Sequence, residues 1–347
     1  MDYNEQNGLT NESQGAPRDE QGGAGNIPRK KISIWKILGR IIFALSVLAN
    51  IVLLFALFAL AAVFLTGKAG TLIEEVIQPG PSSAKIAVIN VAGVLDDENA
   101  DKIIKQIKAS EKDGSVKALI LRVNSPGGGI AASDRIYNEA VQYRRKMNRP
   151  VVAFMQQVAA SGGYYVSVAA DEIIAEPTAI TGSIGVIAQM FVLKELLENK
   201  LGIQPVTMIV GDKKAWPNPF APITEEQKKY LDERILTPAY NRFVGIVAER
   251  RKMIDPNDIK RLADGSIYNA DSAVQEKLID EIGYIADAVV KAKELAGIKD
   301  ARVIEYQKPF SMARLLGSET SSLFRFTRNS LNELNCPQVM YLWSVYQ

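Results

Sequence analysis

One serine in this sequence stands where a nucleophile could be activated. Ser161 lies in Ala159-Ala-Ser-Gly-Gly163, after an apolar run typical of a buried strand and before residues that favour a helix. At such a strand-to-helix turn, with small neighbours, a serine hydroxyl can act as a nucleophile, and the N–H of Gly162 can stabilise an oxyanion. The alternative is a serine that only caps the helix, which by itself is the commoner reason for this placement.

The composition limits which base could activate that serine. The chain of 347 residues contains no histidine and a single cysteine, Cys336. Every triad, dyad or metal site that needs an imidazole is therefore excluded, as are an intrachain disulfide and a cysteine cluster. The practical base that remains is a lysine kept neutral by burial in apolar surroundings.

A glycine-rich turn could hold negative charge. Asn124-Ser-Pro-Gly-Gly-Gly129 follows a predicted strand and leads into a predicted helix. Glycines at such a turn free backbone N–H groups to point into a cavity, and the helix N-terminus adds positive potential. The turn therefore suits an oxyanion, although a plain turn that needs positive φ is the alternative. The glycine spacing fits neither a P-loop nor a dinucleotide-binding fingerprint.

Short apolar runs that are rich in β-branched residues alternate with predicted helices around these turns. The runs cover residues 85–91, 116–123, 151–155 and 172–175. Strands of this kind, alternating with helices, indicate a parallel sheet that is covered on both faces. A capping box, Thr224-Glu-Glu-Gln227, predicts the start of a further long helix, which Pro238 should kink. The fold class is therefore α/β.

The N-terminal part of the chain has the pattern of a membrane anchor. Residues 41–67 carry no charge and are rich in Leu, Ile, Phe, Ala and Val. As a helix they would be about 40 Å long, more than the roughly 30 Å of a hydrocarbon core. We expect one transmembrane helix rather than a buried core helix or a cleaved signal peptide, whose apolar region is shorter.

Flanking charges predict the orientation of this helix. Five basic residues precede it within residues 29–40, whereas Lys68 alone follows it before Glu74 and Glu75. The positive-inside rule therefore predicts a single-pass protein of the cell membrane, with a cytoplasmic N-terminus and an extracytoplasmic remainder. That remainder is close to neutral, which gives no support for nucleic-acid binding.

The sequence is expected to divide into five segments. They are a disordered cytoplasmic tail with a basic collar (1–40), the transmembrane helix (41–67), a linker (68–84), one catalytic domain (85–310) and a C-terminal tail (311–347).

Three motifs together resemble a known family. Asn124-Ser-Pro-Gly-Gly128, Ala159-Ala-Ser-Gly-Gly-Tyr-Tyr165 and Thr181-Gly-Ser-Ile-Gly185 occur in the order found in the S49 family of membrane-bound serine-lysine peptidases, the signal peptide peptidase A group. The resemblance covers about residues 85–296. It implies a crotonase and Clp-protease-like fold with ββα units. It also implies a serine endopeptidase that requires no cofactor and no metal.

The resemblance further implies roles for single residues. Ser161 would be the nucleophile, and backbone N–H groups of Gly162 and of Gly127 or Gly128 would stabilise the oxyanion. Ser183 matches the family's second serine, whose hydroxyl orients the catalytic lysine.

The family's base lies in a Gly-x-x-Lys segment followed by Pro-Phe, which selects Lys214 here. Lys213 is the rival, and as a neighbour on an extended segment it should face the opposite way. The sequence departs from the family directly after the base, because Ala215-Trp-Pro-Asn218 replaces the usual small and polar residues. This departure puts substrate specificity in question more than activity.

Substrates and partners are implied by the same resemblance. Remnant signal peptides and other apolar peptide segments would be cleaved at the extracytoplasmic face, membrane lipid would surround the transmembrane helix, and copies of the chain would form a homo-oligomeric ring whose subunits jointly supply the dyad or the groove. The apolar segment 337–343 would lie in the cleft as a self-inhibiting peptide, or dock as a strand on a neighbouring subunit.

Other functions stay open at the level of sequence. A peptidase that cuts one specific membrane partner would look the same. A non-catalytic membrane scaffold on a crotonase fold would keep the glycine turns without needing Ser161, Ser183 and Lys214 together. An acyl-CoA enzyme of that superfamily is hard to reconcile with an extracytoplasmic domain.

Overall fold

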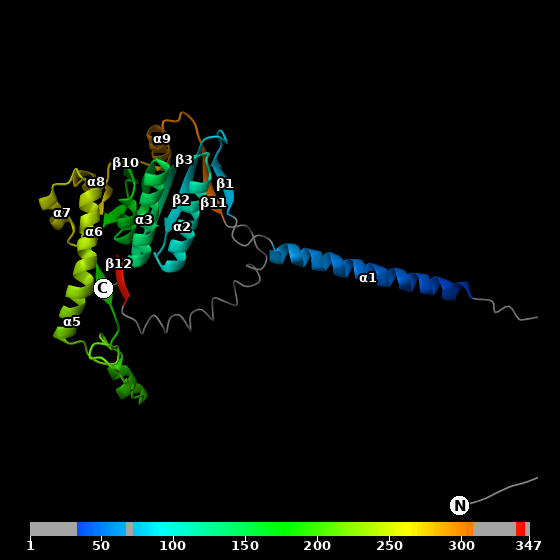
Figure 1. The fold of residues 1–347 in the computed structure, drawn as a ribbon, viewed down its shortest axis with the longest axis horizontal. Helices are drawn as coiled ribbons and strands as arrows, with labels where there is room; N and C mark the ends of the chain where they lie inside the picture. The colour runs from blue at the N-terminus through cyan, green and yellow to red at the C-terminus, as the bar shows by residue number, and fades with distance from the viewer. Residues whose placement is uncertain (1–32, 67–71, 308–337, 344–347) are drawn as a thin grey trace, which may run out of the picture. The chain divides into compact units, whose positions relative to one another are not determined.

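The computed structural model describes residues 33–66, 72–307 and 338–343 (Figure 1). The chain divides into two compact units, one up to residue 67 and one from residue 68 onward. In the first unit the described residues form a single helix, α1 (Ile34–Thr66). Its segment Ile34–Ala61 is long and apolar enough to cross a membrane, and an 18-residue window within it has a mean hydropathy of 2.8. The helix begins before the expected span, because helical hydrogen bonding continues through Lys36 and Arg40.

The second unit is built on a twisted, mostly parallel sheet. Its strands lie in the order β1 (Ile73–Gln78), β11 (Arg302–Gln307), β2 (Lys85–Ala92), β3 (Val116–Ser125), β5 (Val151–Ala160), β6 (Glu172–Ala175) and β10 (Glu281–Ile282). All neighbouring pairs on this path are parallel except β1 with β11, which is antiparallel. The four predicted strands are present, and β3 and β5 extend to the two turns that the sequence singled out.

Apolar side chains on alternate strand positions form two cores, one on each face of the sheet. Ile89 and Leu121 belong to the core beneath α2 (Asp97–Lys112) and α3 (Ile130–Met147), which lie side by side in Figure 1. Ile86 and Ile120 belong to the core beneath α9 (Ile285–Ala296). Because strand side chains alternate between faces, a strand buried on both sides has to be continuously apolar. The expected parallel sheet with two covered faces is confirmed.

One strand lies inside the segment that the sequence marks as a linker. Residues 73–78 form β1, with Ile73 opposite Gln307 and Val76 opposite Ile304. All six residues of β1 are exposed, so they lack the buried apolar pattern that predicts a strand. Pairing with β11, more than 220 residues away, holds the segment, and this contact is invisible in a local reading of the sequence.

Two smaller sets of strands surround the strand-to-helix turns. β12 (Gln338–Leu342) lies antiparallel between β4 (Gly127–Gly129) and β8 (Ile187–Gln189). β7 (Ile180–Gly182) runs parallel to the end of β5 and antiparallel to β9 (Ile267–Asn269).

The predicted long helix begins at Thr224, whose hydroxyl accepts the N–H of Gln227 at 3.2 Å while the Gln227 side chain accepts the N–H of Thr224 at 3.0 Å. This capping box opens α5 (Glu225–Leu231). A π-helical turn, η2 (Asp232–Leu236), then leads into α6 (Thr237–Arg250), with Pro238 in the first turn of α6. The remaining helical elements are α4 (Gly162–Ser167), η1 (Leu196–Lys200), α7 (Pro256–Leu262) and α8 (Ala270–Gln275).

Candidate active site

Ser161 forms the junction between β5 and α4. Its backbone has φ 53° and ψ −114°, a conformation that is strained for any residue with a side chain. The residue is 1% exposed, and its hydroxyl makes no capping hydrogen bond to α4. The helix-cap explanation of this serine is therefore wrong. A strained serine on a strand-to-helix turn has the backbone geometry of a nucleophile elbow.

Small residues around Ser161 are required by close backbone contacts. A Cβ atom added to Gly163 would lie 2.7 Å from the carbonyl oxygen of Ser125, and one added to Gly162 would lie 3.1 Å from the Cα atom of Gly127. Ala159 and Ala160 are fully buried at the end of β5. The glycine-rich turn and the turn of Ser161 thus pack directly against each other.

Ser183 lies beside Ser161 at the end of the neighbouring strand. Ala160 of β5 is paired with Gly182 of β7, so each serine is the first residue after a paired position. The N–H of Ser161 donates to the carbonyl of Gly182 at 2.8 Å, and the N–H of Ser183 donates to the carbonyl of Ser266 at 2.7 Å. Ser183 has φ 51° and is 8% exposed. The structure therefore brings these two sequence-predicted residues together.

The three glycines after Pro126 use their N–H groups differently. The N–H of Gly127 donates to Ser125 Oγ at 3.1 Å, and the N–H of Gly129 donates to the carbonyl of Leu95 at 2.8 Å. Gly128 is paired with Tyr341 of β12. Because hydrogen-bonded pairs in an antiparallel ladder recur every second residue, the 2.8 Å bond from Trp343 N–H to the carbonyl of Pro126 makes Gly128 and Tyr341 a hydrogen-bonded pair. The amide of Gly128 thus faces β12, which fills the groove between β4 and β8.

The C-terminal strand places one carbonyl group at the meeting point of both turns. The carbonyl oxygen of Tyr341 lies 3.1 Å from the position that a Cβ atom on Gly162 would take, and it blocks the corresponding position on Gly127. Gly127 also has φ 101°, which a side chain rarely tolerates. Glycine is therefore required at position 127 for a peptide carbonyl to come this close, and position 162 leaves little room for a side chain.

The side chain of Tyr341 is fully buried in an aromatic pocket. Its ring stacks on Tyr165 with centroids 5.1 Å apart and lies 4.9 Å from the ring of Phe243. Its hydroxyl donates to the carbonyl of Ala239 at 2.7 Å. Burial raises the pKa of Tyr341, so the phenol remains a neutral hydrogen-bond donor. The pocket fits an aromatic side chain with a polar tip.

A charged pair fixes one wall of this aromatic pocket. The hydroxyl of Tyr165 donates to Asp134 Oδ1 at 2.6 Å, and the Arg242 guanidinium donates to the same oxygen at 2.6 and 3.0 Å. The three residues come from α4, α3 and α6. Sequence reasoning missed the pocket, although Tyr165 belongs to a quoted motif, because only the fold brings Phe243 and Tyr341 to it.

The lysine predicted as the base is not joined to Ser161 in the described part of this chain. The side chain of Lys214 is exposed and makes no hydrogen bond or ion pair with another described residue. The rival Lys213 has its Nζ 5.0 Å from the ring centroid of Trp216 and 4.8 Å from that of Tyr230. Trp216 lies in the segment that departs from the family, and its ring contacts the ammonium group of Lys213.

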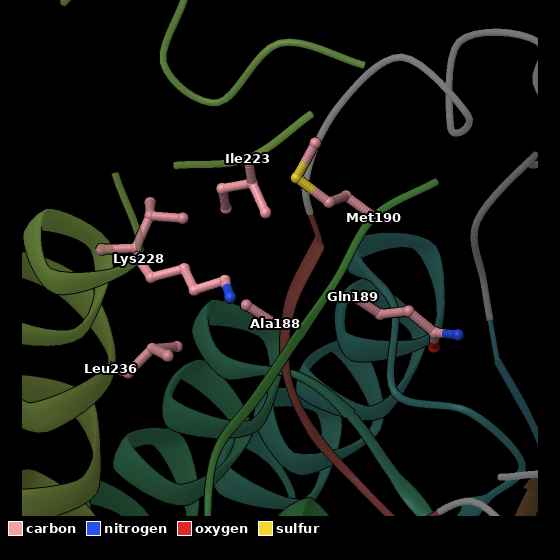
Figure 2. A pocket seen from close by; sticks show the side chains of 7 residues that line it. Ala188, Gln189, Met190, Ile223, Lys228 and Leu236 are labelled. Carbon is pink, nitrogen blue, oxygen red and sulfur yellow. The ribbon is translucent and has the colours of Figure 1, made fainter. Parts of the chain in front are cut away.

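A hollow of about 360 Å³ lies beside β8 (Figure 2). Ala188, which pairs with Val339 of β12, lies on its wall, and Lys228 extends toward it from α5. The Lys228 ammonium is also paired with Glu225 at 2.6 Å. The hollow is lined by Ala188, Gln189, Met190, Ile223, Lys228, Leu231 and Leu236.

A sheet of this topology, a strained serine at the end of β5 and a glycine turn that receives a peptide carbonyl define a serine peptidase of the Clp-protease and crotonase type. A family model of Clp protease matches residues 82–181, and one of peptidase family S49 matches residues 143–299. The chain belongs to peptidase family S49.

Relatives carry names of the same class. The chain is 39% identical to the "Putative signal peptide peptidase SppA" of Enterococcus faecium over 245 residues, which are 67% of this chain and 70% of the relative. It is 36% identical over 228 residues to Protease 4 of Haemophilus influenzae, covering 64% of this chain and 36% of the relative. It is 34% identical over 247 residues to the chloroplastic serine protease SPPA of Arabidopsis thaliana, covering 68% and 35%. The aligned part is thus little more than a third of the last two proteins.

Proposed function

We propose that this protein is a membrane-anchored serine endopeptidase that uses a Ser161–Lys214 dyad to degrade remnant signal peptides and other apolar segments at the extracytoplasmic face of the cell membrane. Membership of family S49 and the names of the relatives support a serine peptidase. The apolar helix α1 supports membrane anchoring, and the basic residues before it support a cytoplasmic N-terminus.

One observation carries the proposal. A peptide strand, β12, lies antiparallel between β4 and β8, with the Tyr341 carbonyl against Gly127 and Gly162 and next to the strained Ser161. A substrate bound in the same way would present its scissile carbonyl to the Ser161 hydroxyl. The residue before the cut would place its side chain in the aromatic pocket.

The chemistry follows from this placement. Ser161 Oγ attacks the scissile carbonyl carbon, and neutral Lys214 Nζ takes the hydroxyl proton. The resulting oxyanion is stabilised by N–H groups of Gly162 and Gly128, since the N–H of Gly127 is already donated to Ser125. The C–N bond then breaks, and Lys214 returns the proton to the leaving amine.

The acyl-enzyme is released by water. Lys214 takes a proton from the attacking water, a second tetrahedral intermediate forms, and the ester bond to Ser161 breaks as Oγ regains a proton from Lys214. The Ser183 hydroxyl holds the lysine amine toward Ser161. Because the base must be unprotonated, activity is expected to rise with pH.

Lys214 is proposed to reach the site within a homo-oligomer. Its exposed side chain and the strongly exposed apolar residues nearby, Val206, Met208 and Val210, support coverage of this segment by another copy. In such a ring one subunit would supply Lys214 to the groove of another, and burial there would favour the neutral amine.

The C-terminal strand is proposed to inhibit the enzyme. β12 occupies the groove that a substrate would need, and its Tyr341 fills the aromatic pocket. β12 lies in the groove of its own chain. This supports self-inhibition rather than docking of the segment as a strand on a neighbouring subunit.

The proposal is tested with full-length protein in detergent and an unstructured peptide with apolar residues at the cut. Ser161→Ala and Lys214→Ala should each lower kcat by about 10³-fold or more. Lys213→Ala is the matched control and should stay within about tenfold, since it removes only two exposed cation–π contacts of about 0.5–1 kcal/mol each. A serine-reactive phosphonate should label wild type but not Ser161→Ala. Full activity in either dyad variant would disprove the mechanism.

A further inference from the structure

Ser125 is a fully buried polar residue of the glycine-rich motif to which the mechanism above gives no role. It is the last residue of β3. Its hydroxyl donates to the carbonyl of Gly93 at 2.6 Å and accepts the N–H of Gly127 at 3.1 Å. One side chain thus connects the loop after β2 to the turn that meets the peptide carbonyl.

The hydrogen bonds of the Ser125 hydroxyl help to determine the directions of the backbone N–H groups in the glycine turn. Successive N–H groups along an extended strand point to opposite edges. In β4 the N–H of Gly129 points to Leu95 at 2.8 Å, and the N–H of Gly127 points to Ser125. The N–H of Gly128 between them is thereby directed to the other edge, where Tyr341 lies opposite it.

Ser125 also contacts the second turn of the site. Its carbonyl oxygen lies 2.7 Å from the position that a Cβ atom on Gly163 would take, and its register partner on β5 is Ala159. The residue therefore touches both chain segments from which the oxyanion donors come. Its burial leaves its hydroxyl no water to replace either protein partner.

We propose that Ser125 is a positioning residue of the oxyanion hole: by holding the N–H of Gly127, it aims the N–H of Gly128 at the carbonyl oxygen of the scissile bond. This inference rests on the proposed function, because it gives the amide of Gly128 a task only if Ser161 attacks a carbonyl there. It predicts that the Ser125 hydroxyl strengthens binding of a ligand that forms the tetrahedral oxyanion and not binding of a ligand that lacks a carbonyl group at this position.

Two ligands separate these contributions in the full-length protein in detergent. Val-Met-tyrosinal and Val-Met-tyrosinol carry the side chains of residues 339–341. The aldehyde carbonyl adds the Ser161 hydroxyl: the Oγ–C bond forms, the C=O π bond breaks, the proton passes to the new oxygen or to the base, and no group leaves. The alcohol fills the same groove without this addition. The ratio of their inhibition constants therefore reports the oxyanion hole.

In Ser125→Ala the aldehyde is expected to bind about tenfold more weakly while the alcohol binds as in wild type, since a misdirected donor should cost less than the 10²–10³-fold of a deleted one. Ser167→Ala is the matched control. Ser167 is also fully buried, but its hydroxyl donates only to the carbonyl of Gly163, at 2.8 Å within its own helix. That variant should keep the wild-type ratio. Partial unfolding lowers the active fraction for both ligands and leaves the ratio unchanged.

The outcomes are distinct. An unchanged ratio in Ser125→Ala, whether both ligands bind normally or both weaken equally, would overturn the role of Ser125. In Ser161→Ala the aldehyde should lose its advantage over the alcohol. If the advantage persisted there, Ser161 would not be the attacking group, and the proposed function itself would fail.

Discussion

Ser161 and Ser183 stand at equivalent positions of two neighbouring parallel strands, each one residue past the pair Ala160 and Gly182 and each with a left-handed backbone (φ 53° and 51°). The carbonyl between them, that of Gly182, accepts the N–H of Ser161 at 2.8 Å. The backbones of two hydroxyl-bearing residues are thus held next to each other where β5 and β7 end.

Removal of the Ser183 hydroxyl should slow the reaction without weakening substrate binding. In Ser183→Ala we expect kcat to fall about tenfold with little change in KM, because the hydroxyl orients the base and does not bind the peptide. Ser183→Cys keeps a weak hydrogen-bonding group without branching at Cβ and should recover part of the loss. Steady-state kinetics on one peptide measure both constants. A rise in KM at constant kcat would instead assign Ser183 to substrate binding.

The glycine turn should not tolerate a side chain at Gly127. Gly127→Ala places a methyl group where the Tyr341 carbonyl oxygen lies and forces an unfavourable φ of 101°. We expect kcat/KM for peptide cleavage to fall by about 10²-fold or more, the range seen when an oxyanion hole is disturbed. Gly114→Ala is the control, since a Cβ there meets nothing within 4 Å. Equal activity of the two variants would remove the turn from the site.

Weakening the C-terminal strand should activate the enzyme. Tyr341→Ala empties the aromatic pocket, and a chain ending before Cys336 removes β12 altogether. Both should raise the initial rate at low substrate concentration, and Tyr341→Phe should do so less, since it loses only the bond to Ala239. A chain that lacks only residues 344–347 keeps β12 and serves as control. Rates unchanged in all variants would argue against self-inhibition.

The ion pair between Lys85 and Asp113 should make stability depend on acid pH. Lys85 Nζ is paired with Glu74 at 2.7 Å and with Asp113 at 2.9 Å. Burial alone would raise the pKa of Asp113, but hydrogen bonds from Ser115 and Lys85 lower it to about 2. Since this pKa lies below the unfolded value, the stabilisation is present above about pH 4 and is lost as the pH falls toward 2.

Thermal unfolding of the wild type and of Asp113→Asn checks this linkage. At pH 6 the variant should melt roughly 2–4 °C lower, the shift that a change of about 1 kcal/mol gives in a domain of this size. The difference should shrink as the pH falls from about 4 and vanish only below pH 2. A difference that is constant with pH would assign the effect to packing and not to the charge of Asp113.

Much of the fold follows from local sequence. The apolar runs of β2, β3, β5 and β6 predict a parallel sheet because a strand that is buried on both faces must be continuously apolar. The capping box at Thr224 can also be predicted from local sequence, because both of its hydrogen bonds join residues that are three apart. The motif order identifies the family, which the comparisons confirm.

Only part of the candidate site can be predicted from residues that are neighbours in the sequence. Ser161 and Ser183 each follow a short apolar strand, but their adjacency depends on the pairing of β5 with β7. In the proposed oxyanion hole, the choice of Gly128 over Gly127 as donor depends on the hydroxyl of Ser125, which accepts the N–H of Gly127. Lys214 remains a prediction of the motif, because its side chain is exposed and makes no hydrogen bond or ion pair with another described residue.

By itself the sequence determined the absence of imidazole chemistry, the apolar anchor, the strands of the core and the serine at a strand-to-helix turn, all of which depend on composition or on neighbours within a few residues. Tertiary structure alone decided the strand in the expected linker, the aromatic pocket and the docking of residues 338–342 between β4 and β8. These features join residues that are far apart in the chain, and their stability comes from pairing and burial that no local pattern records.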